Sequence, residues 1–174
     1  MKRSLLALTL VLAGALPAQA ADGPTDVVRR LYQAYLDARP EGLPTPAQMK
    51  VFAPLLSQRL VRLVEEARQH QSNYAKHNPG DKPPFVEGCL FASLFEGPTA
   101  FEIDRMEPQA DGRQVVLVSF SYSDPQRPQP PFRWSDAVFV RLEKGRPVVD
   151  DVEFRGEWAF KPGGRLSQLL AARD

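Results

Sequence analysis

The sequence contains few of the residues that build metal, redox or disulfide sites. It has one cysteine, Cys89, and two histidines, His70 and His77. A single cysteine cannot close an internal disulfide, which excludes a disulfide framework. Neither the spacing of the histidines nor any C-x-x-C or H-E-x-x-H pattern predicts a metal site. Cys89 lies in an apolar run without a neighbouring cation, which favours a small core residue over a nucleophile.

The chain also carries almost no net charge. The 22 Lys and Arg residues stand against 21 Asp and Glu residues, which gives a formal net charge of +1. Nucleic-acid-binding domains are usually strongly basic, so no nucleic-acid partner is expected. Glycine-rich phosphate loops and a G-x-S-x-G elbow are missing as well, so the sequence predicts no cofactor. Proline, in contrast, is abundant, with 17 residues in a chain of 174.

The first twenty residues have the pattern of an export signal. Lys2 and Arg3 precede an apolar run over residues 4–13, and Ala18-Gln19-Ala20 fits the A-x-A cleavage pattern. The run is shorter than the roughly 20 residues that a membrane-spanning helix needs. We expect a Sec-type signal peptide cleaved after Ala20, with no lipoprotein cysteine. The remainder, 21–174, is then a single periplasmic or secreted α+β domain.

Helical patterns occupy the first half of the remaining chain. A helix is predicted to begin at Pro24 and to end before Pro40, with one apolar stripe. Thr45 and Gln48 form a capping box that opens a second helical region, in which Pro54 predicts a break. Residues 71–86 are predicted to form a loop. The apolar residues expected to be buried in the two helical regions are Val27, Val28, Leu31, Tyr32, Tyr35, Leu36, Val51, Phe52, Leu55, Leu56, Leu60, Leu63, Val64 and Ala67.

Strand patterns dominate the second half. Residues 89–95 fit a buried strand or a single helical turn. Residues 114–123 are predicted to form a strand with Val116, Val118, Phe120 and Tyr122 on one face, and Lys144-Gly145 predicts a hairpin between 134–142 and 146–154. A further strand is expected at 100–106, and a short helical turn at 166–170. Helices followed by antiparallel strands indicate an α+β fold with helices on one face of the sheet. Four or five strands curved around the helices would form a cone with a pocket.

Five segments carry a resemblance to a known family: VRRLYQAYL (28–36), PLLSQRLVRL (54–63), PPFVEGCLFASLF (83–95), VVDDVEFRGEW (148–158) and GRLSQLL (164–170). In combination they resemble domain-of-unknown-function family 3828, a family of exported bacterial proteins. The resemblance implies the nuclear-transport-factor-2-like, or SnoaL-like, cone. It implies no activity, because that fold serves both enzymes and binding modules.

Two carboxylates are candidates for a pocket. Strict alternation over 146–154 places Asp150 on the more apolar face of its strand, and Asp136 is in phase with Trp134. Tyr122 is also on an apolar face. If these faces line one concavity, Tyr122, Trp134, Asp136 and Asp150 would bind a ligand there. A desolvated carboxylate can act as a base or a neutral donor; the alternative is that both aspartates cap turns or pair with arginines.

Three function classes are compatible with these patterns. The first is an exported, non-catalytic binding or accessory protein that holds a small or peptide-like ligand or an envelope protein. The second is a pocket enzyme with isomerase-type or hydrolase-type acid–base chemistry on Asp136 and Asp150, assisted by Tyr122. The third is an immunity or inhibitor protein. The proline-rich segments 71–87 and 124–132 are candidate binding loops, and a homodimer through the open sheet face is a further option.

Overall fold

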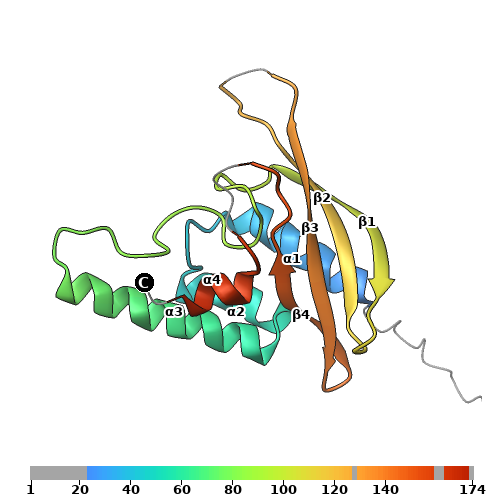
Figure 1. Cartoon of the computed structure of the whole chain (residues 1–174), viewed down its shortest axis with the longest axis horizontal. Helices are drawn as coiled ribbons and strands as arrows, with labels where there is room; N and C mark the ends of the chain where they lie inside the picture. The colour runs from blue at the N-terminus through green and yellow to red at the C-terminus, as the bar shows by residue number, and fades with distance from the viewer. Residues whose placement is uncertain (1–22, 127–128, 159–162, 173–174) are drawn as a thin grey trace, which may run out of the picture.

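The computed structural model describes residues 23–126, 129–158 and 163–172 (Figure 1). The expected signal peptide and its cleavage point lie outside these residues. None of the helices within them is long and apolar enough to cross a membrane. The elements in chain order are α1 (Pro24–Ala38), α2 (Pro46–Phe52), the 3-10 helix η1 (Ala53–Leu55), α3 (Gln58–His77), β1 (Ala100–Pro108), β2 (Gln114–Tyr122), β3 (Phe132–Glu143), β4 (Arg146–Glu153) and α4 (Leu166–Ala171).

The four strands form one antiparallel sheet in the order β1-β2-β3-β4. Figure 1 shows the helices on one side of this sheet, and the β2–β3 hairpin projecting beyond them. The expected α+β class is therefore confirmed. The predicted hairpin at Lys144-Gly145 is confirmed too, since β3 and β4 pair up to Glu143 and Arg146.

The helix α1 forms where the sequence predicts it. Asp26 accepts a 2.9 Å hydrogen bond from the Gly23 N–H, and Pro24 follows the N-cap. Arg39 ends the helix in the left-handed conformation. The apolar stripe that the sequence predicts is buried against the sheet and α2, as the burial of Tyr32 and its neighbours shows.

The second helical region breaks at Pro54, as predicted. Thr45 and Gln48 exchange both capping-box hydrogen bonds, and the Ser57 hydroxyl caps α3 by accepting from Leu60 N. The prediction that Val51 is buried is wrong, because this residue is 54% exposed. The seven residues of α2 end before the helical stripe can continue into α3, so Val51 lies on the outer side.

The prediction of a loop over residues 71–86 is wrong for its first part, because residues 71–77 are helical. α3 continues to His77, and Asn78 caps it through hydrogen bonds to the Tyr74 carbonyl. Apart from the adjacent Tyr74 and Ala75, residues 71–77 are polar, so they carry no apolar periodicity. They also lack Pro and Gly, so nothing in them breaks the helix.

Residues 89–95 form neither the strand nor the helical turn that the sequence allowed. They follow an irregular path into the interior, where Leu90, Phe91, Ala92 and Ser93 are buried. The Tyr32 hydroxyl donates to the Phe91 carbonyl at 3.0 Å, and the Phe91 ring stacks on Phe52. Tertiary partners thus replace the hydrogen bonds that a regular element would have supplied.

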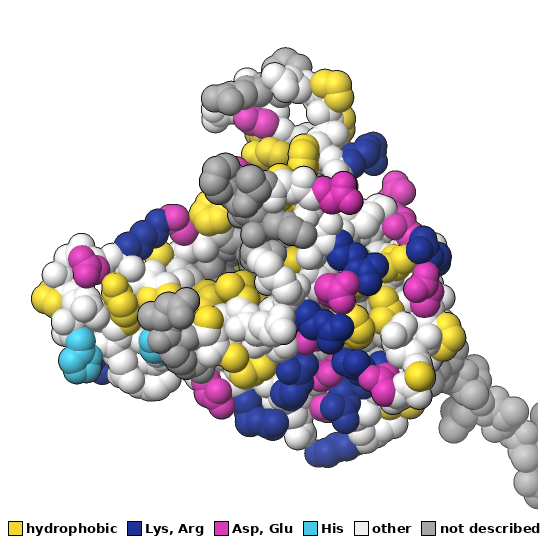
Figure 2. All heavy atoms as spheres, viewed as in Figure 1, with side chains coloured by type: hydrophobic (Ala, Val, Ile, Leu, Met, Phe, Trp, Pro, Cys, Tyr) yellow, Lys and Arg dark blue, Asp and Glu magenta, His cyan; other side chains and the backbone are white. Residues whose placement is uncertain are grey.

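The two faces of the sheet differ in what covers them. Val116, Val118 and Phe120 of β2 enter the main core beneath the helices, as the alternation predicts. On the opposite face a small buried cluster contains Leu117 and Phe139. Arginine side chains, including Arg113 and Arg165 over the Phe139 ring, cover this cluster. Figure 2 shows basic side chains gathered around the β3–β4 hairpin with acidic side chains between them.

Gly42 joins the end of α1 to the loop that carries Phe85. Its φ is +65°, and an added Cβ would lie 2.0 Å from the Phe85 carbonyl oxygen. Gly42→Ala is therefore expected to lower the free energy of unfolding by about 2–4 kcal/mol, from left-handed strain plus a backbone clash. Gly112→Ala is the control, because Gly112 also has positive φ but nothing within 4 Å of an added Cβ. Gly112→Ala should lower the free energy of unfolding, measured in urea, by about 1 kcal/mol. Equal losses for the two variants would contradict the close contact between Gly42 and the Phe85 carbonyl.

Candidate functional site

The sheet has an uneven end at β3. β4 pairs with β3 only from Ala137 onward, where Glu153 lies opposite. Residues 132–136 of β3 still pair with β2, but no strand among the described residues pairs with their other side. The chain leaves β4 at Phe154, whose N–H donates to the Gly164 carbonyl instead of continuing along β3. This difference in strand length creates a recess beside the first five residues of β3.

Four aromatic side chains gather at this recess. Trp134 stacks on Phe120 with ring centroids 5.4 Å apart. Phe132 lies 6.0 Å from Trp134, and Trp158 packs edge-on against both, at 5.3 and 6.0 Å. Trp134 is nearly buried, whereas 46% of Phe132 is exposed. The cluster therefore extends from the core to the surface.

The recess is a cleft of about 480 Å³, which lies within the range of ligand pockets, roughly 300–1,000 Å³. We call it the aromatic cleft, and it is lined by Phe132, Arg133, Trp134, Ser135, Arg155, Gly156, Glu157 and Trp158. Consecutive residues of β3 line it although their side chains point to opposite faces. Such a lining arises only along the edge of a strand, so the cleft runs along the open edge of β3.

Asp136 lies beneath the aromatic cleft and is fully buried. Its Oδ2 accepts hydrogen bonds from Ser93 N at 2.8 Å and from Trp134 Nε1 at 3.2 Å. Its Oδ1 accepts from Arg155 N at 2.8 Å and from the Ser93 hydroxyl. Four donors thus surround the carboxylate. This arrangement stabilises a buried charge and favours a structural role over proton transfer to a ligand.

Asp150 occupies a β-bulge. Its neighbours Val149 and Asp151 pair with consecutive residues of β3, so Asp150 is the extra residue of β4. The extra residue reverses the alternation, and Val149 and Val152 both enter the main core. The prediction that Val148, Asp150 and Val152 share one face is therefore wrong.

Asp150 and Asp136 lie in different surroundings. Asp150 Oδ1 accepts from Arg59 Nε at 3.3 Å, and its carbonyl accepts from Arg59 Nη2 at 2.6 Å. Asp150 also lines a separate cleft with Arg113 and Arg141. It lies opposite Phe139 and Val140, which are three and four residues from Asp136 along β3. At ~3.3 Å per residue, this separates Asp150 from Asp136 by about 10–13 Å. The structure therefore does not place the two carboxylates around one pocket.

Of the other two predicted ligand-binding residues, Trp134 contacts Asp136 directly, whereas Tyr122 lies four positions along the sheet from it. Tyr122 is paired with Phe132 across β2 and β3, and it packs half-buried against the main core. Trp134 lines the aromatic cleft itself. Sequence reasoning did not select Phe132, Arg133, Arg155 and Trp158 as ligand-binding residues. The alternation of Phe132 and Trp134 directly after a proline-rich connection is a signal that could have pointed to part of this set.

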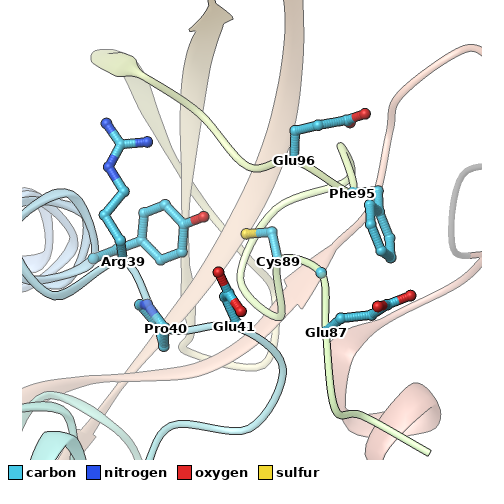
Figure 3. Close-up of a pocket in the computed structure, with 9 residues that line it drawn as sticks. Arg39, Pro40, Glu41, Glu87, Cys89, Phe95 and Glu96 are labelled. Carbon is cyan, nitrogen blue, oxygen red and sulfur yellow. The ribbon is translucent and has the colours of Figure 1, made fainter. Parts of the chain in front are cut away.

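A second pocket, of about 380 Å³, lies around Cys89. Figure 3 shows Arg39, Pro40 and Glu41 on one side, and Glu87, Cys89, Phe95 and Glu96 from the irregular loop around them. Burial raises the pKa of the Cys89 thiol to about 11, despite a hydrogen bond with Tyr35 that lowers it. The thiol is protonated at neutral pH, so this pocket does not present a reactive nucleophile.

Within the described ranges, no group of three or more His, Cys, Asp or Glu side chains could hold a metal ion. Comparison with known proteins gives no relative: no family model, no curated protein and no solved structure matches the chain. The function therefore has to be argued from the geometry of the clefts.

Asp136→Asn tests the structural role of the carboxylate. The amide would place an NH₂ group against two of the four donors, and we expect the free energy of unfolding to fall by about 2–4 kcal/mol. The control is Asp104→Asn, because the exposed Asp104 accepts one side-chain bond, from Ser119. Ser93→Ala, which removes one donor, should cost about 1–2 kcal/mol. Losses below about 1 kcal/mol for both buried variants in urea unfolding would contradict this role.

Cys89 should react slowly with iodoacetamide. With a pKa of about 11, only a small fraction of the thiol is ionised at pH 8. Because a thiolate of higher pKa is also more nucleophilic, the net rate should be about tenfold below that of a free cysteine peptide. The rate should keep rising between pH 9 and pH 11, where the free peptide levels off. A rate at pH 8 equal to that of the peptide would show that the thiol is not held in a desolvated site.

Proposed function

We propose that this chain is an exported, non-catalytic binding or accessory protein that holds a small apolar or peptide-like ligand, or a segment of an envelope protein, in the aromatic cleft. The observation that carries this proposal is the cleft itself. It brings both tryptophans of the chain, Trp134 and Trp158, together with the exposed Phe132 along the open edge of a strand.

The chemistry of the lining supports binding. Aromatic side chains offer a large contact area at low conformational cost, and ligand pockets combine such surfaces with few polar groups. Arg133 and Arg155 supply those groups, and Asp136 fixes the Trp134 ring from below through its indole N–H. A side chain held by a hydrogen bond is preorganised, which reduces the entropy lost when a ligand binds.

The proposal includes the nuclear-transport-factor-2-like cone and the resemblance to domain-of-unknown-function family 3828. Helices on one face of an antiparallel sheet are compatible with that fold. The irregularities after Ile103 and at Asp150 support a curved sheet, because β-bulges bend and twist strands. The export signal over residues 1–20 supports a periplasmic or secreted location.

No specific observation favours the two alternatives. Acid–base catalysis by Asp136 and Asp150 would require carboxylates free to exchange protons with a common ligand, but one accepts four hydrogen bonds and the other pairs with Arg59. The immunity or inhibitor class stays a hypothesis about a partner.

Fluorescence can test occupancy of the aromatic cleft, because both tryptophans line it. The probe is 8-anilinonaphthalene-1-sulfonate, an anionic aromatic molecule that accepts energy from tryptophan. We expect saturable binding that Phe132→Ala weakens about tenfold, equivalent to about 1.4 kcal/mol. Phe95→Ala is the matched control, since Phe95 is 58% exposed at the Cys89 pocket. Equal effects of the two substitutions, or no saturable binding, would contradict the proposal.

A further inference from the structure

The outer edge of β1 and the open stretch of β3 at residues 132–136 differ in how they are protected. The outer edge of β1 carries an irregularity after Ile103 and the charged residues Glu102, Asp104 and Arg105, and it ends at Pro108. Bulges, charges and proline are the usual devices that keep an edge strand from pairing with another chain. The outer edge of β1 is therefore unfavourable for the addition of another strand.

The open edge of β3 lacks the bulge and the proline of β1, and Arg133 is its one exposed charged side chain. Residues 132–136 pair with β2 in unbroken register and contain no proline. In the described part of the chain, no backbone hydrogen bond joins them to anything but β2. In an antiparallel strand every second residue directs its N–H and C=O to the same side. The cleft side of β3 therefore presents backbone donors and acceptors that no described residue pairs with.

Side chains keep this edge open. After β4 ends, Arg155 N donates to Asp136 Oδ1 at 2.8 Å and Gly156 N donates to the Ser93 hydroxyl at 3.2 Å. These N–H groups of the segment after β4 thus donate to two buried side chains and not to the backbone of β3. Trp158 then packs on Phe132 and forms the opposite wall of the cleft.

We propose that the open edge of β3 binds an extended acidic peptide segment by strand addition, with the aromatic cleft accepting its alternate side chains. This inference rests on the proposed binding function and names the ligand class of the same site. Because Asp136 is fully buried, the edge that lines the cleft is residues 132–135, which span about 14 Å at ~3.4 Å per residue. Backbone hydrogen bonds supply affinity in this mode of recognition, and side-chain pockets supply specificity.

Charge selects the acidic character of the segment. Arg133 is exposed, and within the described residues its guanidinium makes no ion pair or hydrogen bond. Arg155 lies across the cleft, where Glu153 holds its Nε at 2.6 Å, and Glu157 is the one acidic side chain in the lining. Phe132 and Trp134 alternate with Arg133 along β3, so the segment should alternate apolar residues with carboxylates in the same way. An apolar side chain would then contact the rings while a carboxylate meets Arg133.

The experiment begins with a displayed library of random heptapeptides, selected on the full-length mature protein. The selected peptide is synthesised, and its affinity is measured by tryptophan fluorescence. We expect alternation of apolar and acidic residues. N-methylation of alternate residues, those whose N–H faces β3, should weaken binding at least tenfold, and N-methylation of the intervening residues should change it less than twofold. Binding that ignores N-methylation, or responds equally at every position, would overturn strand addition.

Charge reversal supplies the protein-side test. Arg133→Glu should weaken binding of the selected peptide about tenfold. A peptide whose acidic residues are replaced by lysine should bind this variant again. Arg105→Glu on β1 is the control and should change neither affinity. If no peptide binds while the anilinonaphthalene probe still depends on Phe132, the cleft is a binding site but the peptide proposal is wrong. If neither the peptide nor the probe binds, both proposals are wrong. Both are also wrong if a second copy of the chain occupies the edge and excludes the peptide.

Discussion

The buried carboxylate of Asp136 is the interaction on which the rest of this end of the molecule depends. Its two oxygens accept from the backbone and hydroxyl of Ser93, from the indole of Trp134 and from the backbone of Arg155. These donors come from three separate parts of the chain. A buried charge is tolerated only where hydrogen bonds replace its water, so the irregular loop, β3 and the segment after β4 are held in one arrangement.

That arrangement explains why a cleft exists. Had the chain continued past Glu153 along β3, the Arg155 and Gly156 N–H groups would have been available to extend the ladder, but they bond to Asp136 and Ser93 instead. The sheet is therefore one strand narrower beside residues 132–136, and Trp158 closes the recess from the other side. The same carboxylate that the sequence offers as a candidate base acts here to shape the recess beside β3.

Local signals predicted the parts of the fold that local interactions decide. The Thr45–Gln48 capping box, the break at Pro54 and the shared face of Val116, Val118 and Phe120 each depend on a few neighbouring residues, and each is confirmed. The bulge at Asp150 and the path of residues 89–95 depend on partners far along the chain, which no periodicity records. The aromatic cleft escaped sequence reasoning for the same reason, because Trp158 meets Phe132 only after β4 has turned away.

The central claim is that the backbone edge of residues 132–136 is open in the free protein. Amide hydrogen exchange resolved by NMR tests it directly, because exchange reports whether each N–H has a lasting partner. Every second amide of 132–136 should exchange at least about tenfold faster than the amides of Val138 and Val140, which lie between β2 and β4. Uniformly slow exchange along the whole of β3 would show that this edge is already covered, and would contradict the account.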